Sequence, residues 1–307
     1  MRRSDRLALI GSLAVAASAA SPAQAQTPLL GHYPPGQSGI RGAATPEPSF
    51  VITNFNRFFS NLEVVDGGGN VVQDMDEVRY ANITMLSWTT SHEFLGMRFG
   101  MLAGIPFATG NLRPADTETD TGSFSLGDVL LTPVSLYGKS ELFDYQFQFT
   151  YWSSSGRFEP GATTNRGTGF ESLVYSLGGV FYPGGDRNNW SLSAVARLGQ
   201  NFEQDGTGIT PGDDLVLDWG IGRMVTLFGR RAELGVSGYG AWQLNDQSGP
   251  AGAPDPGRYH YFGIGPEGSI PLTKELSMRI RAQWEFGAQN LVSGNNLWVI
   301  FSWRVAP

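Results

Sequence analysis

The chain has 307 residues, a formal net charge of −7 and no cysteine, which excludes disulfide bridges, thiolate metal sites and cysteine nucleophiles. An acidic chain without a basic tract also argues against nucleic acid as a partner. Its 41 glycines and 12% aromatic residues accompany only 16% charged residues, and many aromatic residues fall at alternate positions, so strands and turns are favoured over helices.

Residues 1–25 are predicted to be a secretory signal peptide. A basic start, MRRSDR, precedes an apolar stretch from Leu7 to about Ala20, and small residues lead to Ala25, after which we expect cleavage. The apolar stretch is shorter than the roughly 20 residues that a membrane-spanning helix requires, and no later segment comes closer. We therefore expect an exported chain without a transmembrane helix.

Residues 26–48 form a leader in which proline and glycine are too frequent for a regular element. Two interpretations are open. The leader is either a disordered periplasmic tail, the usual fate of such termini, or a plug that folds into the lumen of the β-barrel that residues 49–307 are predicted below to form. A plug would bury the side chains of Leu29, Leu30 and Tyr33 and would bring Arg41 close to an inward-facing acidic residue.

Residues 49–307 are predicted to form an all-β domain, a transmembrane antiparallel up-and-down β-barrel of about twelve strands. Each candidate strand has roughly ten or more residues, enough to cross a bilayer at a tilt and about twice the usual length in soluble sandwiches. In Tyr145–Tyr151 aromatic and polar residues alternate, and in Leu276–Phe286 apolar residues alternate with polar and charged ones. One face of each strand would meet lipid and the other would meet water.

The remaining strands have weaker signals. Weaker alternation occurs in Phe94–Ile105, Trp190–Leu198, Leu215–Ile221 and Leu297–Val305. Spacing and β-branched or aromatic content place six more strands near Phe50, Ile83, Val129, Val174, Val236 and Phe262. An even strand count leaves both ends of the barrel in the periplasm.

The connections alternate in length, as in outer-membrane barrels with tight periplasmic turns and long outer loops. Short connections are expected at Ser91–Glu93, Gly138–Glu141, Pro183–Asn189, Gly229–Arg231 and Leu272–Glu275. Long connections are expected at Phe59–Asp76, Phe107–Ser123, Ser153–Gly169, Asn201–Gly212, Asn245–Gly257 and Ala288–Asn295. In a secreted soluble β-sandwich or lipocalin-like barrel, apolar and polar residues would also alternate along the strands. The alternation of short and long connections would then be accidental.

Several short motifs occur in a fixed order between His32 and Asn290: HYPPGQSGIRG with TPEP, SSGRFEPGA, PGDDLVLDWGIG, GVSGYGAWQLNDQSG, GPEGSI and QWEFGAQN. As an ordered set they resemble the outer-membrane transporters of the phenol meta-pathway degradation family. The resemblance implies a barrel for uptake of aromatic or other hydrophobic compounds, without identifying a substrate. Such chains commonly end on an aromatic residue that the barrel assembly machinery reads. This chain ends Trp303-Arg304-Val305-Ala306-Pro307, so the insertion signal is either displaced to Trp303 or weakened.

Inward-facing charges are the best candidates for a functional site, because an ionisable side chain at membrane depth is costly unless it faces water or a partner. If the turn near Thr273 sets the register, Glu267 lies across from Ile280 and beside Arg279 and Arg281. The cluster is either a constriction that selects solutes by charge or an ion-pair network that fills a narrow barrel. Glu267 or Glu233 would be the partner of Arg41 in a plug. The other lumen candidates are Arg98, Gln146, Gln148, Arg197, Asp218, Glu285 and Arg304.

Catalysis is the weaker hypothesis, although outer-membrane phospholipase A is also a barrel of similar strand number with a Ser/His pair. The three histidines are His32 in the leader, His92 in an expected turn, and His260, which would point to lipid at the outer rim. No serine lies at a motif spacing from His260. The acidic run Asp116–Gly122 departs from a calcium loop, because its glycine comes one place late and its twelfth position is Gly127.

We therefore expect a non-enzymatic outer-membrane channel or transporter that passes small hydrophobic or aromatic solutes, without metal or cofactor. The alternatives are a structural barrel without an open pore and an outer-membrane lipid hydrolase. The expected partners are outer-membrane lipids, the barrel assembly machinery and small solutes, and the expected location is the bacterial outer membrane.

Overall fold

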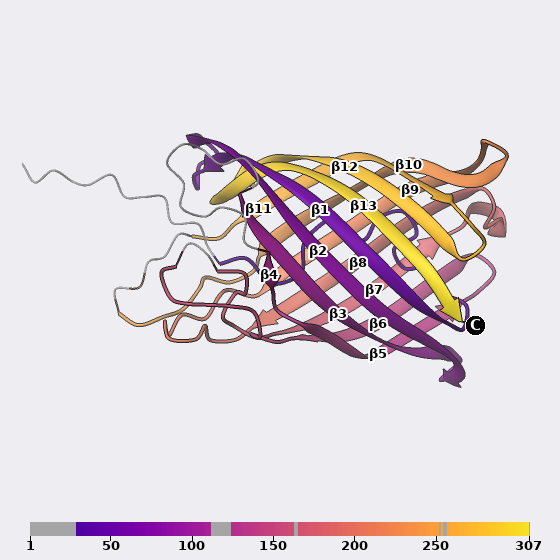
Figure 1. Ribbon diagram of the computed structural model, residues 1–307, viewed down its shortest axis with the longest axis horizontal. Coiled ribbons are helices and arrows are strands. Elements are labelled where there is room, and N and C mark those ends of the chain that lie inside the picture. The colour runs from indigo at the N-terminus through magenta and orange to yellow at the C-terminus, as the bar shows by residue number, and fades with distance from the viewer. Residues whose placement is uncertain (1–28, 112–123, 163–164, 252, 254–256, 307) are drawn as a thin grey trace, which may run out of the picture.

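The fold is a closed antiparallel β-barrel, which confirms the predicted fold class (Figure 1). The computed structural model describes residues 29–111, 124–162, 165–251, 253 and 257–306, so the predicted signal peptide and the acidic run Asp116–Gly122 lie outside the described residues. In this described part, twelve long strands form the wall, each pairs with the next, and the first pairs with the last to close the barrel.

The wall strands are β1 (Ser49–Val65), β2 (Val71–Phe94), β3 (Met97–Asn111), β5 (Leu130–Lys139), β6 (Phe143–Trp152), β7 (Ser172–Phe181), β8 (Trp190–Asn201), β9 (Asp214–Leu227), β10 (Arg230–Gln243), β11 (His260–Pro271), β12 (Leu276–Gln289) and β13 (Leu291–Ala306). The two-residue strand β4 (Ser125–Leu126) pairs with β3, and η1 (Pro183–Gly185) is one 3-10 turn. Among the described residues, no helix is long and apolar enough to cross a membrane.

Long loops gather at one end of the barrel, which we call the outer end (Figure 1). The start of β1 and the end of β13 lie together at the opposite, inner end. Three of the expected long loops are confirmed, namely those between β6 and β7, β8 and β9, and β10 and β11.

Two other expected long loops are wrong. At Phe59–Asp76, β1 and β2 stay paired almost to a tight turn, in which Asp66 Oδ1 accepts the backbone N–H groups of Gly68 and Asn70 at 2.8 Å each. The polar residues of this segment suggested a loop, whereas they lie on a hairpin that extends beyond the rest of the wall. At Ala288–Asn295, β12 and β13 are separated by the single residue Asn290, which has a φ of 55°.

The inner connections are short, as expected. One of them is displaced along the chain. The turn expected at Ser91–Glu93 lies at Leu95–Gly96, because β2 and β3 pair out to Phe94 and Met97. His92 is therefore part of a strand. Most of the loop expected at Phe107–Ser123 lies outside the described residues.

Side-chain alternation gives the wall an apolar outer face and a mixed inner face. On β6, Phe147 is 37% exposed on the outside, whereas Gln146 is 5% exposed in the lumen. On β2, Leu86 and Trp88 are exposed outside, and Ser87 between them lines the lumen. A predominantly apolar outer face is the form that a barrel wall takes in lipid.

A polar patch interrupts the outer face on β1 and β2. Asn54 and Asn56 alternate with lumen-facing residues and lie opposite Thr84 and Asn82. Asn54 Nδ2 donates to Asn82 Oδ1 at 3.2 Å and to Thr84 Oγ1 at 2.9 Å. Asn56 Nδ2 donates to Asn54 Oδ1 and to Val299 O, and Asn82 Nδ2 donates back to both asparagines of β1. The amide donors are thus paired within the wall, which limits their cost in lipid.

The two faces of β6 predict different effects of the same substitution. Phe147→Arg places a charge on the outer face in the middle of the strand, where lipid exposure costs about 2–4 kcal/mol at the bilayer midplane. Gln148→Arg places the same charge in the lumen. We expect only Phe147→Arg to reduce the amount of folded protein in outer-membrane fractions, measured by heat-modifiable electrophoretic mobility. Equal loss in both variants would contradict the assignment of the two faces.

Candidate functional site

The described part of the leader, residues 29–48, lies inside the barrel rather than forming a tail outside it. It runs from the outer end, where His32 meets Ser172 at the start of β7, to the inner end, where Thr45 Oγ1 donates to Gly138 O at 2.6 Å. The indigo trace of this segment is visible within the wall in Figure 1. Gly36, with a φ of 82°, allows a tight turn in which a Cβ would collide with Gln283 and Tyr239.

Asp218 of β9 holds the middle of the leader. Its carboxylate accepts the Tyr33 hydroxyl at 2.6 Å, the Gly36 N–H at 2.8 Å and the Ser38 N–H at 3.1 Å. Arg197 Nη1 donates to the same carboxylate at 3.0 Å, and Nη2 donates to Ser38 Oγ at 2.6 Å. The Arg197 guanidinium also lies 4.1 Å from the centre of the Tyr33 ring. The leader therefore forms hydrogen bonds with both members of one ion pair of the wall, Arg197 and Asp218.

The structure brings Glu267, Arg279 and Arg281 together, but the predicted register is off by one residue. Glu267 lies opposite Arg281 and not Ile280, because the turn is centred on Lys274. Residues directly opposite in an antiparallel pair share one face, so an inward Glu267 requires an inward partner. Arg281 Nε lies 2.8 Å from the Glu267 carboxylate, and Arg279 Nε lies 3.3 Å from it.

This cluster also binds the leader. The Ile40 N–H donates to both Glu267 carboxylate oxygens at 3.2 Å, and Arg281 Nη1 donates to the carbonyl oxygens of Gly36 and Gln37. Gly39 packs so closely on the ion pair that a Cβ there would collide with Glu267 and Arg281. The leader thus needs glycine where its backbone crosses the charged side chains.

Arg41 joins the leader to β10 nearer the inner end. Its Nε donates to Glu233 at 2.7 Å, and its Nη2 donates to Arg187 O at 2.8 Å. Ser191 Oγ donates to the same Glu233 carboxylate at 2.8 Å. Of the two acidic partners considered for Arg41, the structure selects Glu233.

The other sequence-predicted residues differ in their surroundings. Arg98 donates to the leader at Pro46 O at 2.7 Å, and Gln146 donates to Gly42 O at 3.5 Å. Gln148 donates to Tyr137 Oη at 3.1 Å and lines open lumen. Glu285 accepts the Tyr239 hydroxyl at 2.6 Å. Arg304 is exposed at the end of β13, opposite Val51 of β1.

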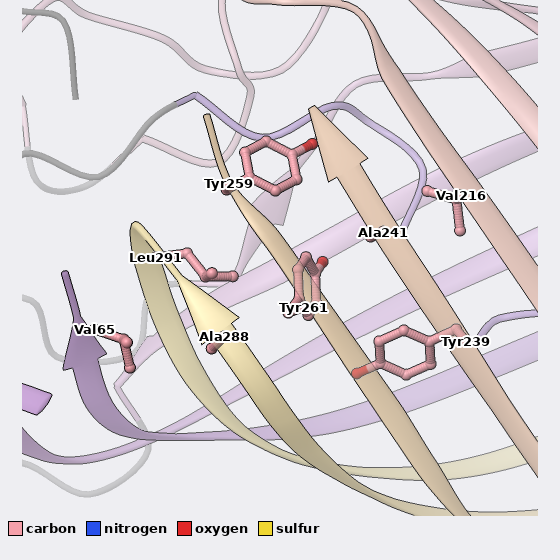
Figure 2. Packing of buried hydrophobic residues seen from close by; sticks show 8 residues of the cluster. All are labelled: Val65, Val216, Tyr239, Ala241, Tyr259, Tyr261, Ala288 and Leu291. Atoms are coloured by element: carbon pink, nitrogen blue, oxygen red, sulfur yellow. The ribbon is translucent and has the colours of Figure 1, made fainter. Parts of the chain in front are cut away.

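Among the apolar residues of the leader, Tyr33 packs against a cluster of buried side chains at the outer end of the barrel. Figure 2 shows this cluster, which includes Tyr239 on β10, Tyr261 on β11 and Tyr259 directly before β11. Leu29 is partly buried, whereas Leu30 is 43% exposed at the outer mouth. The expected burial of Leu30 is therefore wrong, because its side chain lies at the open mouth of the barrel.

His32 is the contact that sequence reasoning missed. Its Nδ1 lies 2.8 Å from Ser172 Oγ, its Nε2 lies 3.2 Å from Asp128 Oδ2, and its ring stacks on Trp152 at 5.3 Å. Asp128 lies in the break between β4 and β5, which turns its carboxylate into the lumen. Burial alone would raise the pKa of Asp128, but hydrogen bonds from His32 and from backbone N–H groups hold it below its ordinary value. No sequence motif predicts the contact between His32 and Asp128, because the two residues are far apart in sequence.

Ser172, His32 and Asp128 have the composition of a hydrolytic triad but not its hydrogen bonding. The Ser172 hydroxyl donates to Asn201 Oδ1 at 2.6 Å, so its proton is directed away from His32. The arrangement anchors the leader and does not activate a nucleophile. His260 contacts Phe262 at the outer end of β11. In the described part of the chain, no group of three or more acidic, histidine or cysteine side chains could hold a metal ion.

Charged side chains of β8 to β12 bind the middle of the leader, and a cavity of about 360 Å³ remains between this part and the opposite wall. Apolar and hydroxyl side chains dominate the lining of this inner cavity, and Arg197 is the one charged residue among the described residues that line it. A second, outer cavity of about 450 Å³ lies at the outer mouth. Tyr33 borders both cavities.

Comparisons with known proteins agree with this architecture. A sequence profile of the family described as "Putative MetA-pathway of phenol degradation" matches residues 63–301. The COG4313 outer membrane channel from Pseudomonas putida F1 is similar in structure, with a TM-score of 0.69 and 12% identity over 88% of this chain and 99% of that one. This likeness shows a shared barrel fold.

Two further solved structures are less similar. The β domain of the Bordetella autotransporter BrkA has a TM-score of 0.48 and 12% identity over 84% of this chain and 100% of that one. A deltaS2 mutant of the TodX monoaromatic hydrocarbon channel has a TM-score of 0.43 and 11% identity over 87% and 93%. A comparison with curated protein sequences finds no match.

The position of the leader predicts the effect of removing it. Deleting residues 27–47 should raise single-channel conductance in planar bilayers, because the lumen beside β8–β12 would then fill with water. The barrel should still assemble, since Asp218 keeps Arg197 and Glu267 keeps Arg281 as wall partners. A leader of equal length made of glycine and serine serves as the control and should conduct like the deletion. A deletion that conducts no better than the intact protein would contradict the plug.

Proposed function

This chain belongs to the MetA-pathway of phenol degradation family, and we propose that it is an outer-membrane channel through which small hydrophobic or aromatic solutes diffuse. The shared fold with a bacterial outer membrane channel supports the proposal. The apolar outer face of the wall supports a location in a membrane. The family description supports an aromatic cargo.

The inner cavity is the observation that carries this proposal. It lies beside the leader and follows β1 to β7, where side chains such as Phe55, Met85, Leu102 and Val174 alternate with serine and threonine hydroxyls. Because Arg197, the one charged residue among the described residues of the lining, is paired with Asp218, this passage accepts an apolar ring without removing an unpaired charge from water. Such a lining favours uncharged solutes over ions.

In this proposal the lumen charges hold the leader and do not select solutes. Asp218, Glu267 and Glu233 each bind a leader group, and each is less than 10% exposed. A charge that is buried and already neutralised by a partner interacts only weakly with an ion that passes through the lumen. Of the two interpretations of the charged cluster, the geometry therefore favours an interior network that fixes the leader and narrows the lumen.

The space beside the leader favours an open passage over a barrel without a pore. Gln148 and Ser87 face the inner cavity, and the leader leaves this side unfilled. The unfilled side favours passage over a purely structural role. For a lipid hydrolase, by contrast, the hydrogen-bond directions around Ser172 offer no support.

Filling the inner cavity should block transport. Ser87→Trp adds a large ring to the lumen face of β2, and we expect it to lower the initial uptake of radiolabelled toluene by Gram-negative cells several-fold. Cells with an empty vector define the background. Their lipopolysaccharide must be intact, because it is the barrier that the channel bypasses.

Leu86→Trp is the matched control, because it makes the same residue on the same strand at a position 38% exposed on the outer face. Its uptake should equal that of the unmodified protein. Both variants are first checked for folding by heat-modifiable mobility. Uptake by the unmodified protein at the empty-vector rate would refute the channel, and equal uptake by the two tryptophan variants would refute the route.

A further inference from the structure

The outer cavity is lined by a residue with a buried hydrogen-bond acceptor that no described residue pairs. Asn61 of β1 lines this cavity and is 5% exposed. Its Nδ2 donates to Glu77, which fixes the orientation of the amide, because the opposite orientation would set two acceptors against each other. Its Oδ1 is buried and has no hydrogen-bond partner among the described residues. A buried acceptor without a donor is unfavourable.

The charged groups around the cavity already have partners. Glu285 accepts the Tyr239 hydroxyl at 2.6 Å and the Gly294 N–H at 2.8 Å. Arg57 Nε donates to Asn296 Oδ1 at 2.6 Å, and its guanidinium lies 4.6 Å from the centre of the Phe59 ring. Arg79 pairs with Glu77 at 3.2 Å, and Asn201 Nδ2 donates to Asp214 at 3.2 Å. Among the described residues that line the cavity, Asn61 Oδ1 is the buried polar atom that lacks a partner.

The rest of the lining suits an apolar ring. Tyr259, Tyr261 and Leu291 form one wall, as Figure 2 shows, and they belong to the buried cluster of the outer end. Pro34 and Pro35 of the leader form another side. A volume of about 450 Å³ is within the usual size of small-molecule sites. A planar ring can pack on these surfaces, as aromatic side chains do in protein interiors.

We propose that the outer cavity binds neutral aromatic compounds that carry a hydroxyl group, and that Asn61 Oδ1 accepts the hydrogen bond from this hydroxyl. The inference rests on the proposed channel function and names the class of solute captured at its mouth. An arene without a donor leaves Oδ1 unpaired. An aromatic carboxylate would bring a negative charge to a lining whose described residues include three acidic side chains, Glu77, Glu285 and Asp214, against two arginines, Arg57 and Arg79.

The test compares two rings that differ in the donor. The purified full chain in lipid nanodiscs is titrated with 4-fluorophenol and with 4-fluoroanisole, and binding is followed by fluorine NMR against empty nanodiscs. One hydrogen bond to an otherwise unpaired buried acceptor corresponds to about a tenfold preference for the phenol. Asn61→Leu should abolish this preference while leaving anisole binding within about twofold.

Asn56→Leu is the matched control, because it makes the same change on the same strand on the outer face, and it should keep the preference. Equal binding of the two rings to the unmodified protein, or a preference that survives Asn61→Leu, would overturn the inference. If toluene uptake is normal in either case, the channel stands and only the hydroxyl site falls. Absence of binding together with uptake at the empty-vector rate would overturn both.

Discussion

Carboxylates buried inside the barrel need several hydrogen-bond donors, and the leader supplies donors that the wall does not. Asp218 and Glu267 are 1% and 3% exposed, and each has one arginine partner on the wall within 3.0 Å. Leader N–H groups and the Tyr33 hydroxyl complete their hydrogen bonding. The leader also needs these hydrogen bonds. Because it is rich in proline and glycine, it forms no helix or strand that would pair its own backbone groups, and side chains of the wall pair them instead. Removing one partner of such a buried pair typically costs about 3–5 kcal/mol.

The asymmetry of the lumen follows from where these charges lie. They are on β8 to β12, so the leader is held against that half of the wall. Small residues make room for it: a Cβ on Gly220 would lie 2.6 Å from the backbone nitrogen of Ile40. The other half of the lumen keeps its apolar and hydroxyl side chains uncovered. The interactions that fix the leader against β8 to β12 therefore also leave a largely uncharged passage along the other half of the wall.

Alternation along single strands was sufficient to predict the barrel, because a lipid-facing wall imposes a period of two on each strand. Loop boundaries were predicted less well. The hairpin of β1 and β2 extends beyond the apolar zone, and there its polar residues are as compatible with a strand as with a loop. The facing of Arg197, Asp218 and Glu267 follows from the same alternation. Their contacts with the leader do not, since a segment without regular structure has no periodicity from which to infer its path.

The site residues missed from sequence illustrate the same limit. His32 and Asp128 meet across 96 positions of sequence, and Asp128 lies in the break between β4 and β5. Asn61 lies in β1, in a part of the chain that was expected to belong to the long connection Phe59–Asp76. What distinguishes it is an unmet hydrogen bond, a property of its surroundings that no residue type or spacing encodes.

The leader is joined directly to β1, and β1 forms the closing seam with β13. A finished barrel would have to admit His32 and Tyr33 past the charged side chains of a narrow lumen, whereas an open sheet would let the leader lie down sideways on β8 to β12. The geometry thus favours an order of assembly in which the leader docks first and the seam between the two chain ends closes last. Pairing residues so distant in sequence is slow, and a docked leader would hold β1 near its partner while that pairing forms. The segment that narrows the finished channel would then also speed closure of the wall around it, although the wall can close without it.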